Sequence, residues 1–298
     1  GVRDTSRFIP TTGDGVGNWM DTYEGGWQTV FPGGGFPSKY GEADLGLHAE
    51  ANTMPWDSVI TEDNVDKVSV KFSVRTYRTP FYFEKTLTLE RNSSVLYVDQ
   101  VLTNEGEEDI HCVWGEHIAL GAPFLDSSCV IYVPDVNILN HPTKMHENSK
   151  LEPGLKTKWP YTKLQDGTKH DLSKVPGKEF RAYDQSYLEG FDKGWYAITN
   201  HQKKVGFGVS YPSDLYKYLW YWQSLGGGFG YPWYGRTYNI GLEPFTSITN
   251  EGLQTAIDNK TALLMKAGQR VEASITAVAY TSELPVSKID ARGNLSFS

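Results

Sequence analysis

The sequence predicts an all-β protein built from large, mostly antiparallel sheets. Aromatic residues make up 13% of the 298 residues, a share that favours strands over helices. Several segments place apolar residues at every second position, which is the pattern of a half-buried strand. Short polar turns join these segments, and short connections imply antiparallel pairing. A two-sheet sandwich or an open barrel would fit all three observations.

The first 57 residues are Gly-rich and irregular, and residues 24–35 cannot form a helix because Gly is costly there and Pro breaks it. We expect this stretch to be a loop that carries aromatic side chains across the surface. Regular alternation follows, with a turn at Asn92-Ser93-Ser94. The strands that it predicts span residues 67–75, 81–89 and 95–103.

The second half of the chain continues this pattern around one polar excursion. Residues 140–180 contain Pro and Lys throughout and are expected to lie on the surface, with His141, His146 and His170 solvated. We expect residues 1–298 to form a single domain that includes this excursion. Further strands are predicted over residues 110–121, 194–199, 205–210, 262–267 and 271–280.

Composition and charge restrict the function. The net charge of -8 and the lack of a basic run argue against nucleic acid and anionic membranes as partners. No stretch is apolar enough to span a bilayer, and residues 1–10 lack the apolar core of a signal peptide. We expect a cytoplasmic protein, with an extracellular one as the alternative, and the oligomeric state stays open. Cys112 and Cys129 are either a disulfide or two free buried thiols.

A held carboxylate beside aromatic rings is the chemical feature that stands out. Glu243 follows an apolar run and precedes Pro244, which biases Glu243 towards an extended conformation at a strand end. Upstream, residues 219–233 are rich in aromatics and Gly. Flat rings beside an acceptor suit a sugar, whose C–H faces stack on rings while its hydroxyls need hydrogen-bond partners. The candidates for the pocket wall are Trp222, Gln223 and Trp233.

Two pairs of polar residues could complete a site: His48 with Glu50, and Glu116 with His117. Imidazole and carboxylate together suit Mn, Fe or Zn. However, Glu116 and His117 are adjacent and face opposite sides of a regular strand, which disfavours a metal shared between them. A His and a Glu on different strands could instead act as acid and base across one bound sugar, without a metal or other cofactor.

Four segments, in this order along the chain, resemble the aldose 1-epimerase (galactose mutarotase-like) family. They carry His48, His117, Asp192 and Glu243, although Ala49 stands where the family more often has Gly. The resemblance implies a β-supersandwich fold. The segments are Leu47-His48-Ala49-Glu50, Gly115-Glu116-His117, the stretch 190–195 around Asp192, and Leu242-Glu243-Pro244.

The resemblance also implies an enzyme that interconverts the anomers of a small sugar. Glu243 would take the proton of the anomeric hydroxyl, and His117 would protonate the ring oxygen. His48 and Asp192 would hold hydroxyls, and Arg78 is a candidate for binding a hydroxyl or an acidic substituent. One alternative is a non-catalytic carbohydrate-binding protein on the same fold. The other is a metal-dependent sugar isomerase or lyase that uses His48, Glu50 and His117.

Overall fold

A computed structural model describes residues 15–298, and its chain packs as two compact units. Unit 1 contains residues 15–24, 28–116 and 246–275, and unit 2 contains residues 25–27, 117–245 and 276–298. The single domain expected over residues 1–298 stays a prediction. The N-terminal residues 1–10, for which the sequence gives no signal-peptide core, lie outside the described residues.

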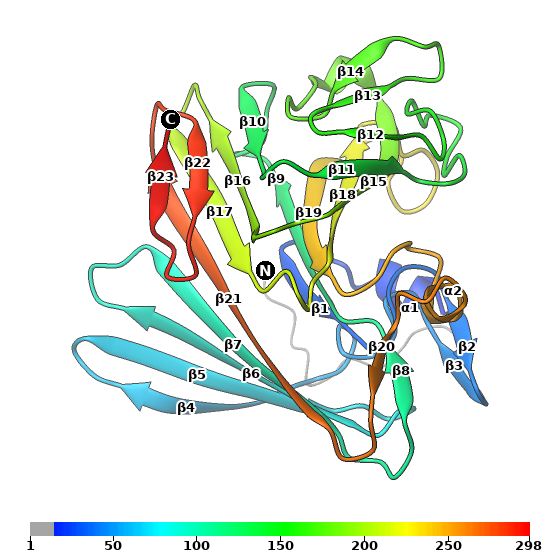
Figure 1. The fold of residues 1–298 in the computed structure, drawn as a ribbon, viewed down its shortest axis with the longest axis vertical. Helices are drawn as coiled ribbons and strands as arrows, with labels where there is room; N and C mark the ends of the chain where they lie inside the picture. Colours follow the sequence, from blue (N-terminus) through cyan, green and yellow to red (C-terminus); the bar gives the residue numbers. More distant parts are fainter. Residues whose placement is uncertain (1–14) are drawn as a thin grey trace. The chain divides into compact units, whose positions relative to one another are not determined.

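Unit 1 is organised around an antiparallel meander. Strands β4 (Asp57–Asp63), β5 (Lys67–Arg75), β6 (Phe81–Glu90) and β7 (Val95–Asn104) follow one another in the chain and in the sheet (Figure 1). The strands predicted over 67–75, 81–89 and 95–103 are therefore confirmed, within a residue at each end. The remaining elements of this unit are α1 (Gly17–Met20), β2 (Ser38–Tyr40), β3 (Ala43–Leu45), β8 (Ile110–Cys112), α2 (Leu253–Asp258) and β20 (Leu263–Met265).

The core of unit 1 is aromatic. The ring of Phe31 packs on Phe81 with a centroid distance of 4.9 Å, and Phe83 packs on Trp114 at 5.1 Å. Phe81 and Phe83 alternate with half-buried residues along β6, as the period of two predicted. Three strands cross from one unit to the other along the chain: β1 (Trp27–Val30), β9 (Gly115–Gly121) and β21 (Arg270–Thr281).

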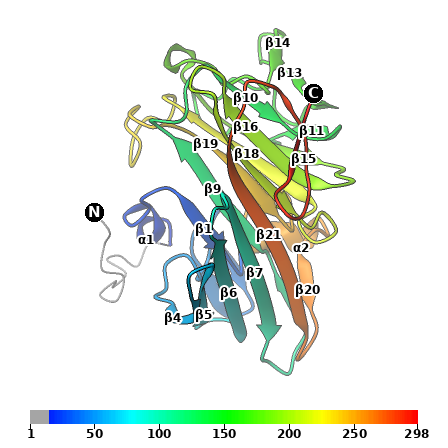
Figure 2. The same ribbon diagram turned by 90° about the vertical axis from the view of Figure 1, so that its left-hand side faces the viewer.

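Unit 2 contains two sets of paired strands. One runs in the order β19-β18-β15-β11-β12, with β9 beside β19, and the other in the order β10-β16-β17-β21. Figure 2 shows β15, β18 and β19 from a second direction. The strands of this unit are β10 (Cys129–Tyr132), β11 (Asn137–Asn140), β12 (Lys156–Lys158), β13 (Tyr161–Lys163), β14 (Lys169–Asp171), β15 (Ala182–Glu189), β16 (Gly194–Asn200), β17 (Val205–Tyr211), β18 (Tyr218–Leu225), β19 (Tyr238–Phe245), β22 (Val286–Ile289) and β23 (Leu295–Phe297); a 3-10 turn covers Lys178–Phe180.

The excursion over residues 140–180 is more integrated than its polar composition suggested. Its strand β12 pairs with β11, which pairs in turn with β15, and β13 pairs with β14 as a small hairpin. His141 is buried, contrary to the prediction of a solvated loop side chain. His170 stacks on Phe180 with a centroid distance of 5.2 Å. Short strands of three residues carry too little alternation to be recognised in a sequence.

Two further expectations concern thiols and membranes. Cys112 and Cys129 are both free and buried. Of the two alternatives that the sequence left open, two free thiols are therefore observed and a disulfide is not. Burial raises the pKa of both, because a thiolate loses hydration in an apolar surrounding. In residues 15–298, none of the helices has the length and apolar character needed to cross a bilayer.

Candidate active site

The hairpin of β18 and β19 places Glu243 on a defined face of the sheet. Trp220 lies directly opposite Glu243, and Trp222 lies opposite Gly241. Directly paired residues share a face, and residues two apart along a strand do so as well. Glu243 and Trp222 therefore point to the same side. Trp220 also stacks on Phe245, with ring centroids 3.7 Å apart, which fixes the strand end that carries the carboxylate.

His117 enters this face from β9, the strand beside β19. Its Nε2 lies 3.5 Å from Oε1 of Glu243, and the two side chains are only 5% and 2% exposed. The structure thus brings together the imidazole and the carboxylate that we predicted from the sequence as acid and base. The two residues are 126 positions apart in the chain, a separation that does not by itself predict contact. Their chemical roles stay predictions.

Gly241 provides the room for the Glu243 carboxylate. A Cβ atom built at Gly241 would collide with Oε1 of Glu243. The side chain of Glu243 therefore lies back over the Gly241 position, and any larger residue there would displace it. The apolar run before Glu243 is evident in the sequence. That the position of the carboxylate requires a glycine at residue 241 is evident only in the structure.

Burial shifts the two members of the pair in opposite directions. It raises the pKa of Glu243 well above its ordinary value and lowers the pKa of His117 to about 4, because burial disfavours each charged form. Both shifts favour the neutral forms, in which the carboxyl group of Glu243 is protonated and the imidazole of His117 carries a single proton. The pair therefore has one group that can give a proton and one that can accept it.

An aromatic wall lines the pair. The ring of Trp222 lies 5.7 Å from His117, 6.3 Å from Tyr183 and 5.6 Å from Trp233, centroid to centroid. Burial raises the pKa of Tyr183, and hydrogen bonding to Trp222 and Trp233 opposes part of that shift. The two tryptophans predicted for the pocket wall thus lie together, with Tyr183 as a third member that the sequence analysis did not name.

Gln223 faces the opposite side of the sheet from Trp222. It pairs with Asp184 and Ile240, and all three belong to the face away from Glu243. The prediction that Gln223 lines the same wall as Trp222 is at odds with this alternation. Adjacent residues of a regular strand cannot both point into one site.

Gln185 is the amide that does share the face of Glu243. It lies on β15 directly opposite Trp222, is 4% exposed, and its Nε2 has no hydrogen-bond partner among the described residues. A buried amide donor without a partner is costly and suits a ligand hydroxyl. The sequence does not show that Gln185 belongs to this face, because the pairing of β15 with β18 joins segments that are distant in the chain.

His48 belongs to unit 1, where the backbone holds its ring. The backbone N–H of Gly35 donates to Nδ1 of His48 at 3.2 Å, so the neutral ring carries its proton on Nε2 and presents a donor there. His48 and Ala49 both have positive φ values, 59° and 65°. This left-handed turn explains why a Gly would be common after the His, since only Gly adopts it without cost.

Glu50 holds a loop and is not free to bind a metal. Its Oε1 accepts hydrogen bonds from the backbone N–H groups of Tyr77 and Arg78, both at 2.8 Å, and its Oε2 accepts from the Thr79 hydroxyl at 3.0 Å. Among residues 15–298, no group of three or more His, Cys, Asp and Glu side chains is arranged to hold a metal ion. The metal site considered for His48, Glu50 and His117 is therefore not formed.

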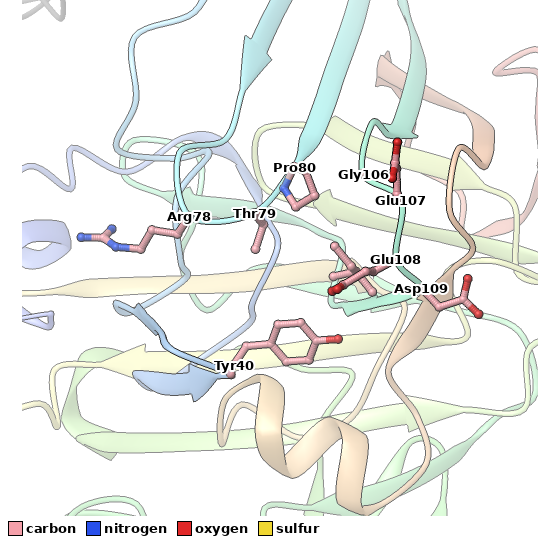
Figure 3. Close-up of a pocket in the computed structure, with 10 residues that line it drawn as sticks. Tyr40, Arg78, Thr79, Pro80, Gly106, Glu107, Glu108 and Asp109 are labelled. Carbon is pink, nitrogen blue, oxygen red and sulfur yellow. The ribbon is translucent and has the colours of Figure 1, made fainter.

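Arg78 is exposed on the loop that Glu50 holds. It lines a surface pocket of ≈ 610 Å³ in unit 1 with Tyr40 and the turn around Glu108. Figure 3 shows its side chain extending to the opposite side from Asp109. Arg78 is part of unit 1, whereas His117 and Glu243 are part of unit 2. Its predicted contact with a substrate stays a prediction.

Asp192 lies in the exposed loop between β15 and β16. The hydroxyl of Ser213 donates to its backbone carbonyl at 3.3 Å. No hydrogen bond or ion pair within the described chain joins its carboxylate to His117 or Glu243. The structure thus does not bring Asp192 to the pair, and its predicted role in holding a hydroxyl stays without support from the geometry.

Comparison with known proteins defines the family and the fold. The family model described as "Domain of unknown function (DUF4432)" matches residues 4–278, which is most of the chain. The chain belongs to this family. No curated protein matches it in sequence.

Solved structures share its fold at low sequence identity. A candidate aldose 1-epimerase from Klebsiella pneumoniae superposes with a TM-score of 0.68 at 13% identity, over 95% of this chain and 69% of that one. A galactose mutarotase-like protein from Clostridium acetobutylicum gives 0.59 at 15% identity, over 89% and 82%. A galactose mutarotase related enzyme from Lactobacillus acidophilus gives 0.58 at 15%, over 86% and 83%. The predicted all-β, galactose mutarotase-like fold of large antiparallel sheets is confirmed.

Proposed function

We propose that this protein is an aldose 1-epimerase-like enzyme that interconverts the anomers of a sugar. The observation that carries the proposal is the buried approach of His117 Nε2 to Glu243 Oε1, at 3.5 Å, beside the ring of Trp222. The two oxygens of a cyclic hemiacetal share one carbon and are closer together than a hydrogen-bonded pair of atoms. Two proton-transfer groups this near each other can reach both oxygens at once.

Ring opening needs one proton taken and one proton given. The Glu243 carboxylate removes the proton of the anomeric hydroxyl while His117 protonates the ring oxygen. The bond between C1 and the ring oxygen breaks, and the anomeric oxygen becomes an aldehyde oxygen. Rotation about the C1–C2 bond then presents the other face of the aldehyde. On closure His117 takes its proton back, and Glu243 returns its proton to the anomeric oxygen, so both groups are restored.

The sugar itself prepares the pair for this step. Hydrogen bonds from sugar hydroxyls to the carboxyl of Glu243 favour its ionised form and oppose the effect of burial. The shared proton then moves to His117, which becomes the acid while Glu243 becomes the base. Because burial raises the pKa of Glu243 and lowers that of His117, the carboxylate is a strong base and the imidazolium a strong acid. Both features speed proton transfer.

The aromatic wall and the side-chain amide of Gln185 would bind the sugar. Trp222 offers a ring face to the apolar side of a sugar. Gln185 offers a buried amide donor on the same face as Glu243. We expect Gln185→Leu to weaken binding more than turnover, with KM rising about fivefold, since one hydrogen bond to a neutral hydroxyl stabilises by about 1 kcal/mol.

Anomer exchange measured by NMR on a panel of aldoses tests the function. The parent should exchange its best sugar faster than buffer alone, and Glu243→Gln should lower the rate by at least about a hundredfold. Gln223→Leu is the matched control, because Gln223 is equally buried but points to the other face of the sheet. Equal rates for parent and Glu243→Gln would show that Glu243 is not the base.

A non-catalytic carbohydrate-binding protein is the second candidate. The aromatic wall of Trp222, Tyr183 and Trp233 would serve binding alone equally well. Sugar binding in calorimetry, combined with no exchange by the parent on any aldose that it binds, would decide for this alternative.

A further inference from the structure

The connection between β18 and β19 is a braced arm of aromatic residues. We call residues 226–237 the aromatic arm. Backbone hydrogen bonds cross it twice, from Gly226 N–H to the Thr237 carbonyl at 2.8 Å and from Gly235 N–H to the Gly228 carbonyl at 2.6 Å. The excursion also holds it, because the side-chain amide of Asn148 donates to the Gly227 carbonyl at 2.9 Å. The arm is thus closed on itself at two levels, and its base is tied to the excursion.

Three aromatic side chains of this fixed arm face solvent. Phe229 is 43% exposed, Tyr231 is 54% exposed and Tyr234 is 58% exposed. In the described part of the chain, no other stretch of six residues exposes three aromatic rings. A local group of exposed aromatic side chains on a braced segment points to a ligand.

The arm continues the wall of the proposed site. Trp233, which belongs to the arm, contacts Trp222, and Trp222 contacts His117. Gly228 lets the indole of Trp233 pack on the backbone, and Gly235 does the same for the ring of Phe229. The rings of His117, Trp222 and Trp233 therefore form a series from the buried pair to the arm that carries the exposed rings.

We propose that the aromatic arm is an outer subsite for a second sugar ring, so that the substrate is the reducing end of a disaccharide or longer oligosaccharide. This rests on the proposed function. The reacting ring must keep its anomeric hydroxyl free at His117 and Glu243, so the second ring is attached through another of its hydroxyls. The arm between its glycines carries aromatic side chains and no Leu, Ile, Val or Met. Ring faces with phenol hydroxyls suit sugars, which combine C–H faces with hydroxyls.

The test compares monosaccharides with reducing disaccharides. Exchange of glucose and galactose is measured by NMR beside that of maltose, cellobiose, lactose and isomaltose, for the parent and for a variant with Phe229→Ala and Tyr234→Ala. We expect the parent to prefer a disaccharide, and the variant to lose about tenfold in kcat/KM on that disaccharide only. Tyr161→Ala, which removes a ring of similar exposure from the same unit, should change neither.

Other results would overturn the subsite or separate its failure from that of the proposed function. Equal effects on both sugar classes, or no effect, would overturn the subsite while leaving anomer exchange intact. If the parent exchanges no sugar, the proposed function fails, and calorimetry with the same disaccharides then decides: binding that the arm variant loses supports the subsite, and no binding overturns it. A change in oligomeric state of the arm variant in sedimentation, without a change in sugar binding, would assign the arm to self-association and overturn the proposal.

Discussion

Replacing His117 by Gln should remove a pH dependence of stability that the parent shows between about pH 6.5 and 4. Burial lowers the pKa of His117 from 6.5 to about 4 in the folded protein. The unfolded chain therefore binds one more proton than the folded chain across this interval. The free energy of unfolding falls as the pH falls, and this contribution is fully present only above the unfolded pKa.

The magnitude follows from the size of the shift. Each pKa unit corresponds to about 1.4 kcal/mol, so the whole shift is worth roughly 3 kcal/mol, of which about 2 kcal/mol is lost already at pH 5. Urea unfolding of the parent and of His117→Gln at pH 7, 6 and 5 measures the difference. The two proteins differ at pH 7 through lost packing on Trp222, so the comparison uses the change with pH. Parallel pH dependences would refute the burial argument for His117.

Three further predictions concern Glu243, Gly241 and Glu50. Because burial raises the pKa of Glu243, Glu243→Gln should become increasingly more stable than the parent as the pH rises above 4.5, and a constant offset in urea unfolding would contradict this. Gly241→Ala should lower anomer exchange by at least about a hundredfold with an unchanged circular dichroism spectrum, since its methyl group displaces the carboxylate. Glu50→Ala should reduce the free energy of unfolding by roughly 3 kcal/mol, because three hydrogen-bond donors lose their charged acceptor, whereas Asp44→Ala at an exposed ion pair should have little effect.

The meander of unit 1 was readable in the sequence because its information is local. Apolar residues occupy every second position along β5 and, except at Lys85, along β6, and a single turn at residues 92–94 separates β6 from β7. Each strand also pairs with its neighbour in the chain. Period, turn and pairing therefore all come from one continuous stretch.

The face of the candidate site was readable only in part. Glu243 and His117 stood out by chemistry and by resemblance, but their contact depends on β9 lying beside β19, a pairing between distant segments. Gln185 could not be found, since nothing in the sequence gives the register of β15 on β18. The orientation of Gln223, in contrast, could be predicted from the sequence. Because Gln223 is adjacent to Trp222 on one strand, alternation places the two side chains on opposite faces.

The burial of His117 and Glu243, which makes stability depend on pH, would also prepare the chemistry proposed for them. An exposed His and an exposed Glu would exist at neutral pH as a weak acid and a weak base. Moving both out of water makes each charged form more reactive and leaves one proton to be shared across 3.5 Å. A hydroxyl-rich ligand that stabilises the carboxylate would then decide where that proton resides. A variant that keeps His117 and Glu243 but admits water, such as Trp222→Ala, should therefore bring both pKa values closer to ordinary ones and slow exchange. NMR titration of His117 would show this as a rise of its pKa from about 4 towards 6.5.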